Sequence, residues 1–461
     1  MRKDRIEGKR ISILGMARSG VSCALLLHKL GAEVFVSDVK KKELLTPQIE
    51  QLEEFDIEYE TAGHTSKALQ NKDFLVVSPG IPSDIPILNQ AENQGIPRFS
   101  EIEVAYWLTD SKIVGITGSN GKTTTVTLLG EILKEDKREY QLGGNIGIPF
   151  SGIVEKVSPE GIIVLELSSF QLEWIEEFRP YVASVLNITL DHLDRHPDMK
   201  AYAEAKLRIL ENQTEEDYAV LNVDDEGSLK FAAFGKSKKV FFSTKTEPEP
   251  GAFVRGGKLI IRLNGKESEI MDIKEIAIQG PHNLSNACAA CAISGILGAS
   301  VETMRRALKN FPGVEHRLEQ VTTISGVSFI NDSKATNVDS VWYALQSVNP
   351  PIILIAGGKD KGGDFRRLRE LVQKNVKAMV LIGEAEDKIK TALGDLVPAF
   401  HTDTLEEAVE LSFKKAASHD TVLLSPGCAS FDMFRDYQHR GLVFKISVRR
   451  LTPKRNATFF I

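Results

Sequence analysis

The chain has 461 residues, which is enough for about three domains that each bury a core of their own. Its 63 acidic and 57 basic residues give a formal charge of −6, without the basic excess of proteins that bind nucleic acid. Four scattered cysteines exclude a disulfide framework, and the apolar stretch Ile11–Met16 is too short for a signal or membrane-spanning segment. We therefore expect a cytoplasmic protein, a monomer, with no membrane insertion and no nucleic-acid partner.

Short β-rich segments alternate with helical patterns along the chain, which is typical of an α/β protein with parallel sheets. We predict a Rossmann-like first domain over residues 1–107, which would bind substrate. Its expected strands are 11–15, 33–38 and 74–80, with a helix over 19–30 between the first two.

A second domain, over 108–312, is predicted to be a parallel sheet of the P-loop ATPase type. Its elements are strands at 112–117, 162–166, 182–189 and 219–224, a helix around 126–133, a β excursion over about 239–278, and helices at 283–297 and 301–310. Pro312-Gly313 is a strong helix breaker and places the boundary. A second Rossmann-like domain follows over 313–461, with strands at 327–331, 352–356, 379–383 and 421–425.

The segment Gly115-Ile-Thr-Gly-Ser-Asn-Gly-Lys-Thr-Thr124 carries the strongest chemical signal. Its glycines let backbone N–H groups converge on phosphate oxygens, Lys122 adds a positive charge, and the Thr123 hydroxyl can hold Mg²⁺. Ile116 stands where the strict pattern has glycine, so the loop is a variant, and an ordinary βα turn is the alternative. Gly-Lys-Thr at a helix start after a buried strand favours a nucleoside triphosphate site.

Polar residues that could complete a metal site follow two later strands. Glu166 ends the apolar strand 162–166, where a P-loop protein needs a metal-binding carboxylate. The segment 187–196 ends another strand in acid, amide and imidazole groups, among them His192. For His192 alone, a solvated loop residue is an equally good interpretation.

Two groups of residues suggest nucleotide recognition elsewhere. The turn Gly15–Gly20 follows a strand and could present backbone N–H groups and Arg18 to a pyrophosphate. Asp38 ends the next strand, where an acid commonly meets a ribose or base edge, and Ser78 is a further candidate. Asn283 and Asn286 lie three apart at a helix start, where they could meet an adenine edge or could cap the helix.

Together these motifs resemble the Mur ligase family of ATP-dependent amide-bond synthetases, in order and across nearly all of the chain. The segments that carry the resemblance are 117–124, 143–147, 166–171, 187–196, 205–208, 280–286 and 315–318. Within the family, segments 331–337, 356–361 and 425–432 are similar to the branch that adds D-glutamate to UDP-N-acetylmuramoyl-L-alanine. The Asp-Asn-Pro-Arg motif expected of the diaminopimelate-adding branch is absent from the sequence.

The resemblance implies an activity and a set of nucleotide contacts. ATP would phosphorylate the alanyl carboxylate, and the amine of D-glutamate would attack the acyl phosphate, in peptidoglycan precursor synthesis. Arg317 and Asp332 would reach ATP from the third domain, which would close over the site. The other ATP-binding residues implied are Gly118, Ser119, Asn120, Gly121, Lys122, Thr123, Thr124, Asn283 and Asn286.

The resemblance also implies two Mg²⁺ positions. Thr123 and Glu166 would hold one ion, and His192 and Lys206 would belong to the second. Because an ammonium group cannot ligate Mg²⁺, Lys206 is expected to be carbamylated by CO₂. From spacing alone, residues 201–211 look like an exposed helix, on which Lys206 would be an ordinary surface lysine. Lys122, Glu166, His192 and Lys206 are the implied catalytic residues.

Substrate contacts follow from the resemblance in the same way. Asn145 would contact the muramoyl nucleotide, together with Arg18, Ser19, Asp38 and Ser78, although Val39-Lys40 departs from the Thr-Arg of this branch. D-glutamate would be captured by Lys334, Thr336, Lys361, Ser430 and Tyr437. Tyr437 stands where phenylalanine is expected, and Lys359 competes with Lys361 for the ligand-facing position.

Two other classes of protein remain as alternatives. A folylpolyglutamate synthase would share the P-loop, the metal site and glutamate addition, but the residues before the P-loop strand argue against it. A non-catalytic P-loop switch would hydrolyse nucleotide without an amino-acid substrate. The spacing of Cys288 and Cys291 resembles a metal motif, but the alanine-rich helix around them favours core packing, so no zinc is expected.

Overall fold

The computed structural model describes residues 2–189 and 195–451. They fall into two compact units, one made of 2–189, 195–276 and 283–311, the other of 277–282 and 312–451. The prediction for His192 lies outside the described residues. None of the described helices combines the length and the apolar content that a bilayer span requires.

The first sheet is a five-stranded parallel sheet in the order β3-β2-β1-β4-β5. Its strands are β1 (Arg10–Leu14), β2 (Glu33–Ser37), β3 (Glu58–Glu60), β4 (Phe74–Val77) and β5 (Arg98–Ser100). The helices are α1 (Arg18–Lys29), α2 (Thr46–Glu53), α3 (Pro86–Asn93) and α4 (Glu101–Tyr106). Along β1, Ile11 and Ile13 join one hydrophobic core and Leu14 joins another, because successive side chains of a strand point to opposite faces.

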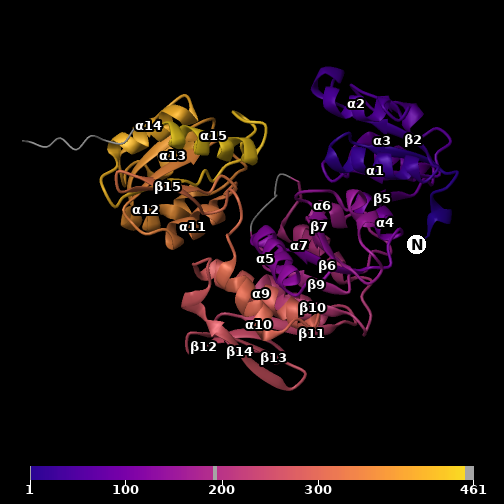
Figure 1. Cartoon of the computed structure of the whole chain (residues 1–461). Coiled ribbons are helices and arrows are strands. Elements are labelled where there is room, and N and C mark those ends of the chain that lie inside the picture. Colours follow the sequence, from indigo (N-terminus) through magenta and orange to yellow (C-terminus); the bar gives the residue numbers. More distant parts are fainter. Residues whose placement is uncertain (1, 190–194, 452–461) are drawn as a thin grey trace, which may run out of the picture. The chain divides into compact units, whose positions relative to one another are not determined.

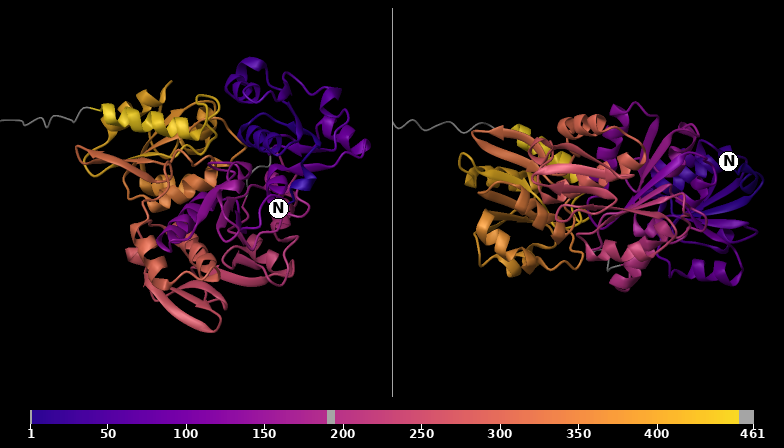
Figure 2. Two further views of the ribbon diagram at one scale, coloured as in Figure 1. Left: turned by 45° about the vertical axis from the view of Figure 1, so that its right-hand side comes forward. Right: turned by 90° about the horizontal axis from the view of Figure 1, so that it is seen from below.

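The second sheet has nine strands in the order β14-β13-β12-β11-β10-β9-β6-β8-β7. They are β6 (Lys112–Thr117), β7 (Tyr140–Gly144), β8 (Ile162–Glu166), β9 (Val182–Val185), β10 (Tyr218–Asn222), β11 (Lys238–Ser243), β12 (Gly251–Arg255), β13 (Lys258–Leu263) and β14 (Lys266–Asp272). Two of its strand pairs are antiparallel, β12–β13 and β13–β14, and both lie at the outer edge of the sheet (Figure 1, Figure 2). The predicted β excursion therefore extends the sheet on one side.

The helices of this region are α5 (Lys122–Glu135), α6 (Ser169–Leu172), α7 (Met199–Leu207), α8 (Glu226–Leu229), α9 (Pro281–Ile296) and α10 (Val301–Asn310). The Ser300 hydroxyl accepts a hydrogen bond from Thr303 N and caps α10, as expected for serine before a helix.

The third sheet has six strands in the order β15-β16-β20-β17-β18-β19, parallel except for the β15–β16 pair. Its strands are β15 (Glu319–Ile324), β16 (Val327–Asn331), β17 (Ile352–Gly357), β18 (Val376–Ile382), β19 (Ala399–His401) and β20 (Thr421–Leu424). Side chains of β17 alternate between two cores. One core is covered by α11 (Val338–Ser347) and α12 (Arg369–Asn375), the other by α14 (Leu405–Lys415) and α15 (Tyr437–Arg450), as Figure 1 shows. Helix α13 (Glu386–Leu393) packs with the first group.

The α/β class and its three sheets agree with the prediction, and most central strands begin and end within two residues of the expected positions. The predicted strand 182–189 is wrong beyond Val185, because Leu186–Thr189 leave the sheet and hydrogen-bond to the P-loop. The missed strands β3, β5, β7, β15 and β19 are short or lack a continuous apolar run.

Candidate functional site

The P-loop lies between β6 and α5, where β6 runs between β8 and β9 in the sheet. Gly118 and Gly121 have φ of 148° and 88°, in the region that favours glycine. A Cβ at Gly121 would lie 2.3 Å from Asn286 Oδ1, and one at Gly118 would lie 3.1 Å from Leu186 Cβ. Both glycines are therefore needed for the shape of the loop and for its contact with neighbouring segments.

Lys122 folds back over this loop. Its Nζ donates hydrogen bonds to Gly118 O at 2.7 Å and to Ser119 O at 2.9 Å. The ammonium group thus lies at the mouth of the glycine turn, where a phosphate would be cradled. Thr124, in the first turn of α5, is buried, and its hydroxyl has no hydrogen-bond partner among the described residues.

A buried carboxylate joins the P-loop to a neighbouring loop. Glu166, 2% exposed, ends β8; its Oε2 accepts from Thr123 Oγ1 at 2.8 Å and its Oε1 accepts from Asn145 Nδ2 at 3.2 Å. The carboxylate and the hydroxyl of this group are oxygen donors of the kind that Mg²⁺ prefers.

Lys206, on α7, is only 1% exposed and reaches the end of the P-loop strand β6. Its Nζ is 3.3 Å from Thr117 Oγ1 and 4.7 Å from the centre of the Tyr202 ring. The interpretation of Lys206 as an exposed surface lysine is therefore wrong. Tyr202 and Lys206 are four residues apart on α7 and share its buried face, which the charged residues around them concealed.

The segments around the undescribed residues contribute further polar contacts. Asn120 N donates to Asn187 Oδ1 at 2.8 Å, and Ser119 Oγ donates to Thr189 O at 3.0 Å. On the other side, His196 Nε2 lies 2.9 Å from Ser169 Oγ. These bonds attach both ends of the 187–196 segment to the P-loop side of the sheet.

Asn283 and Asn286 are both buried within α9. Since α9 begins at Pro281, neither residue is its N-cap, and the capping alternative is wrong. Asn286 Nδ2 is buried without a hydrogen-bond partner among the described residues, next to Gly121. An amide donor in this position fits a ligand acceptor such as a purine nitrogen.

In the first domain, Asp38 and Ser78 shape the glycine turn. Asp38 accepts from Met16 N at 2.7 Å and from Lys40 N at 2.8 Å, and Ser78 Oγ donates to Gly15 O at 3.1 Å. Both side chains are buried, whereas Arg18 is exposed and Ser19 is half-buried at the start of α1. The sequence predicted contacts with a ligand for all four, and the supporting bonds of Asp38 and Ser78 were not foreseen.

In the second unit, Asp332 follows β16 and is buried. Its Oδ2 accepts from Ser425 Oγ at 2.8 Å and its Oδ1 accepts from Leu318 N at 3.2 Å. Burial raises the pKa of Asp332 to about 6, against the lowering effect of Arg317. Arg317 Nε is buried and has no hydrogen-bond partner among the described residues.

The predicted amino-acid-binding residues follow three adjacent parallel strands, β16, β20 and β17. Lys334 Nζ lies 5.4 Å from the centre of the Tyr437 ring, and Thr336 N donates to Lys334 O at 2.9 Å. Ser430 is buried, and its carbonyl accepts from Phe434 N at 2.8 Å. Lys361 and Lys359 are both exposed.

Sequence reasoning missed Arg440, which is buried on α15 beneath these loops. Its guanidinium donates to Ser333 O at 2.8 Å, to Ser333 Oγ at 3.0 Å and to Cys428 O at 3.2 Å. Burial lowers the pKa of Arg440 to about 10. A single arginine in a helical pattern carries no sequence signal for such a role.

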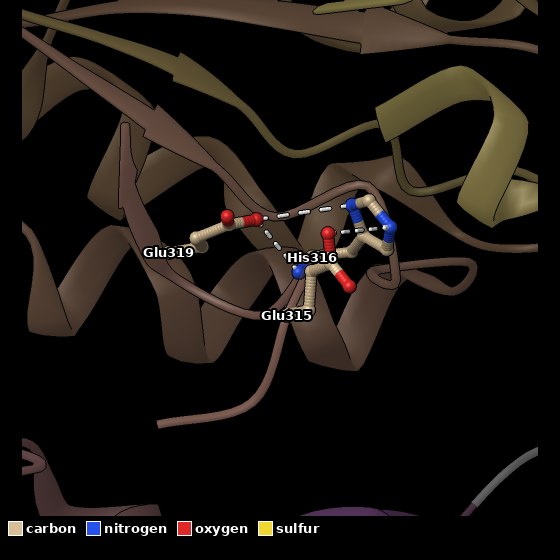
Figure 3. A group of neighbouring side chains, drawn as sticks. All are labelled: Glu315, His316 and Glu319. Carbon is tan, nitrogen blue, oxygen red and sulfur yellow. Dashed lines mark hydrogen bonds and ion pairs between the residues drawn. The ribbon is translucent and has the colours of Figure 1, made fainter. Parts of the chain in front are cut away.

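Glu315, His316 and Glu319 form a second cluster of potential metal ligands in this unit (Figure 3). Lys445 Nζ donates to Glu315 Oε1 at 2.6 Å and to Glu319 Oε1 at 2.8 Å. Burial lowers the pKa of His316, whose Nδ1 lies 2.9 Å from Asn331 Nδ2. Because an ammonium group already balances the two carboxylates, we interpret the cluster as an ion-pair network that braces β15.

Three family models match: "Mur ligase MurD-like, N-terminal domain" at residues 9–100, "Mur ligase middle domain" at 116–294, and "Mur ligase, glutamate ligase domain" at 316–428. A protein of Koribacter versatilis (strain Ellin345) named "UDP-N-acetylmuramoylalanine--D-glutamate ligase" is 44% identical over 97% of this chain and 99% of its own. One of the same name from Thermoanaerobacter sp. (strain X514) is 41% identical over the same shares.

Solved structures agree with the fold. A UDP-N-acetylmuramate-alanine ligase from Thermotoga maritima aligns with a TM-score of 0.62 at 19% identity, over 96% of this chain and 99% of its own. A pseudomurein peptide ligase type C from Methanothermus fervidus aligns with a TM-score of 0.59 at 20% identity, over 90% and 96%. The three-sheet architecture is therefore shared with these proteins.

Proposed function

The chain belongs to the Mur ligase family, and we propose that it joins D-glutamate to UDP-N-acetylmuramoyl-L-alanine at the expense of ATP. The observation that carries the proposal is the group formed by the half-buried Lys122 and Thr123 and the buried Glu166, in a chain similar from end to end to ligases of that name. It is an enzyme of peptidoglycan precursor synthesis.

The reaction has two steps. An oxygen of the alanyl carboxylate attacks the γ-phosphorus of ATP, the bond to the bridging oxygen breaks, and ADP leaves. The neutral amine of D-glutamate then attacks the carbonyl carbon of the acyl phosphate, phosphate leaves, and the amine loses a proton to form the amide. Both steps bring anions together, so catalysis rests on positioning and on charge neutralisation.

Lys122 neutralises phosphate charge in this scheme, moving from its own loop carbonyls to the phosphoryl oxygens. Thr123 and Glu166 would hold one Mg²⁺, which would supply positive charge at the transferred phosphoryl group. The other P-loop residues, Gly118, Ser119, Asn120, Gly121 and Thr124, surround the phosphates, and Asn283 and Asn286 face the adenine.

We propose a carbamylated Lys206, with His192, at the second Mg²⁺ position. The side chain is buried and reaches the P-loop strand, so an uncharged amine there could take up CO₂ and become an oxygen ligand. Protein labelled with ¹³C-bicarbonate should give a carbamate ¹³C resonance that Lys206→Arg lacks. Equal spectra for both proteins would contradict the modification.

The remaining residues divide between the two other substrates. Residues 1–107, with Arg18, Ser19, Asp38 and Ser78, bind the UDP portion, and Asn145 in the central domain, 108–312, lies toward the muramoyl end. In residues 313–461, Arg317 and Asp332 face ATP, and Lys334, Thr336, Lys361, Ser430 and Tyr437 bind D-glutamate. The cytoplasmic location and the monomeric state stay predictions.

Phosphate release tests the proposal directly. ATP and Mg²⁺ are supplied with or without UDP-N-acetylmuramoyl-L-alanine, and D-glutamate, L-glutamate, meso-diaminopimelate or L-alanine is added in separate reactions. Release that requires both the muramoyl nucleotide and D-glutamate is the expected result. Dependence on another amino acid would show that the third domain was misinterpreted, whereas release without the UDP substrate would favour a folate-type enzyme or a P-loop switch.

A further inference from the structure

The loop that follows β7, residues 143–152, contacts the candidate metal carboxylate at one end and the first domain at the other. It contains the motif Gly143-Gly-Asn-Ile-Gly147 and ends in the short 3-10 helix η4 (Phe150–Gly152). All of these residues belong to the same compact unit.

At its first end, the loop is fixed to Glu166 by both backbone and side chain. Asn145 N donates to Glu166 O at 2.8 Å, and Asn145 Nδ2 donates to Glu166 Oε1 at 3.2 Å. Gly144 has a φ of 102°, and a Cβ there would lie 2.3 Å from Glu166 O. A shift of this loop would therefore move the carboxylate that also bonds Thr123.

At its other end, the loop is fixed to helices α1 and α4 of the first domain. Ser151 N donates to Glu101 Oε1 at 2.5 Å, and Ser151 Oγ donates to Ser22 Oγ at 2.9 Å. Arg18, in the predicted UDP-binding turn, donates from Nη1 to Gly147 O at 3.3 Å. Phe150 is fully buried in the core that these helices share with the central domain.

Glu101 is an unusual group for such an interface. It is 1% exposed, and its second carboxyl oxygen is buried without a hydrogen-bond partner among the described residues. Burial raises its pKa. An apolar side chain would fill the space at lower cost, so the hydrogen bonding of the Glu101 carboxyl group with Ser151 of η4 is its main contribution.

We propose that the 143–152 loop couples the UDP-binding turn to the Mg²⁺-binding carboxylate Glu166, and that Glu101 is the positioning residue that holds this loop. The inference rests on the proposed function for the identity of the two ligands. Occupancy of the first domain and the position of Glu166 are thus connected through one short segment that is hydrogen-bonded at both ends.

Helix α4, which carries Glu101, also carries Glu103 as a matched control. Glu103 is also fully buried and also joins α4 to the central domain, accepting from Trp107 Nε1 at 2.9 Å, Glu176 N at 2.9 Å and Phe178 N at 2.8 Å. None of its hydrogen bonds among the described residues reaches the 143–152 loop. Loss of Glu103 therefore reports general damage to the interface without release of the loop.

The test is the Mg²⁺ concentration that half-saturates ATP binding, measured by calorimetry on the full chain without muramoyl nucleotide or amino acid. Glu101→Ala should raise it about three- to tenfold, as expected for a change along a coupling network. Glu101→Gln keeps an oxygen acceptor for Ser151 N and should stay within about twofold, as should Glu103→Ala. Amide exchange of residues 143–152 should accelerate in Glu101→Ala only.

A second variant guards against simple misfolding of Glu101→Ala. A Cβ at Gly152 would lie 2.7 Å from Ile148 Cγ2 and 3.0 Å from Ser22 Oγ, so Gly152→Ala displaces the loop while Glu101 is kept. It should shift the Mg²⁺ requirement in the same direction. Wild-type Mg²⁺ dependence in both variants, or an equal shift in Glu103→Ala, would overturn the proposal. Because these measurements contain no muramoyl nucleotide or D-glutamate, they are independent of the phosphate-release assay that decides the proposed function.

Discussion

The P-loop edge of the central sheet and the loops of the third sheet are built differently. At the P-loop edge, predicted functional residues bond to one another, as Thr123 bonds Glu166 and Glu166 bonds Asn145. In the third sheet, the loops that carry the predicted D-glutamate residues are fastened by groups that the motifs do not single out, above all Arg440. We infer that at the P-loop edge the residues predicted to act on ATP also hold the site together. In the third sheet, the residues predicted to bind D-glutamate are held in place by other residues.

The largest effect is expected at the P-loop. Lys122→Ala should lower kcat by about 10³-fold, because it removes a charge that is used only as the phosphoryl group moves. The KM for D-glutamate should change less than about twofold, since that site belongs to the third domain. Steady-state phosphate release measures both constants. A large rise in the D-glutamate KM would contradict the separation of the two regions.

Arg440 tests the scaffold of the third domain. Arg440→Met should destabilise this domain by about 4 kcal/mol, because it leaves the buried carbonyls of Ser333 and Cys428 without donors. Thermal unfolding provides the measurement. Arg449, exposed on the same helix, is the matched control, and Arg449→Met should cost less than about 0.5 kcal/mol. Equal effects of the two substitutions would remove Arg440 from the scaffold.

Asp332 should make the stability of the third domain depend on pH. Its pKa is about 6 in the fold against an ordinary 3.8, so the folded state holds the proton more tightly than the unfolded state. Stability from this group is therefore fully present below about pH 4 and is lost as pH rises through 6, by about 3 kcal/mol. Asp332→Asn should lack this loss, so the stability difference between the two proteins should change in unfolding experiments between pH 4 and 7. A constant difference would show that Asp332 stays ionised.

The two regions were also unequally predictable from sequence. Glu166 and Thr123 could be placed because a P-loop fixes the strand, turn and helix around them, and strands 112–117 and 162–166 have the predicted bounds. Lys206 was found by resemblance alone, because charges on neighbouring positions of α7 hide its buried face. Arg440 could not be found at all. Its role depends on contacts about a hundred residues away, at Ser333, which no local pattern records.

The smallest predicted effect decides between two lysines. Lys359 and Lys361 both lie exposed after β17, but Lys359 exchanges backbone hydrogen bonds with Ala429, at 2.9 and 3.0 Å, and so belongs to the scaffold of the loop. Lys361→Ala should raise the KM for D-glutamate about tenfold, as expected for one charge-assisted hydrogen bond, and Lys359→Ala should change it less than about twofold. Calorimetric binding of Mg²⁺ and ATP should be unchanged in both. A larger rise in KM for Lys359→Ala than for Lys361→Ala would assign the D-glutamate contact to Lys359. One residue would then both hold the loop and bind the substrate, as residues do at the P-loop.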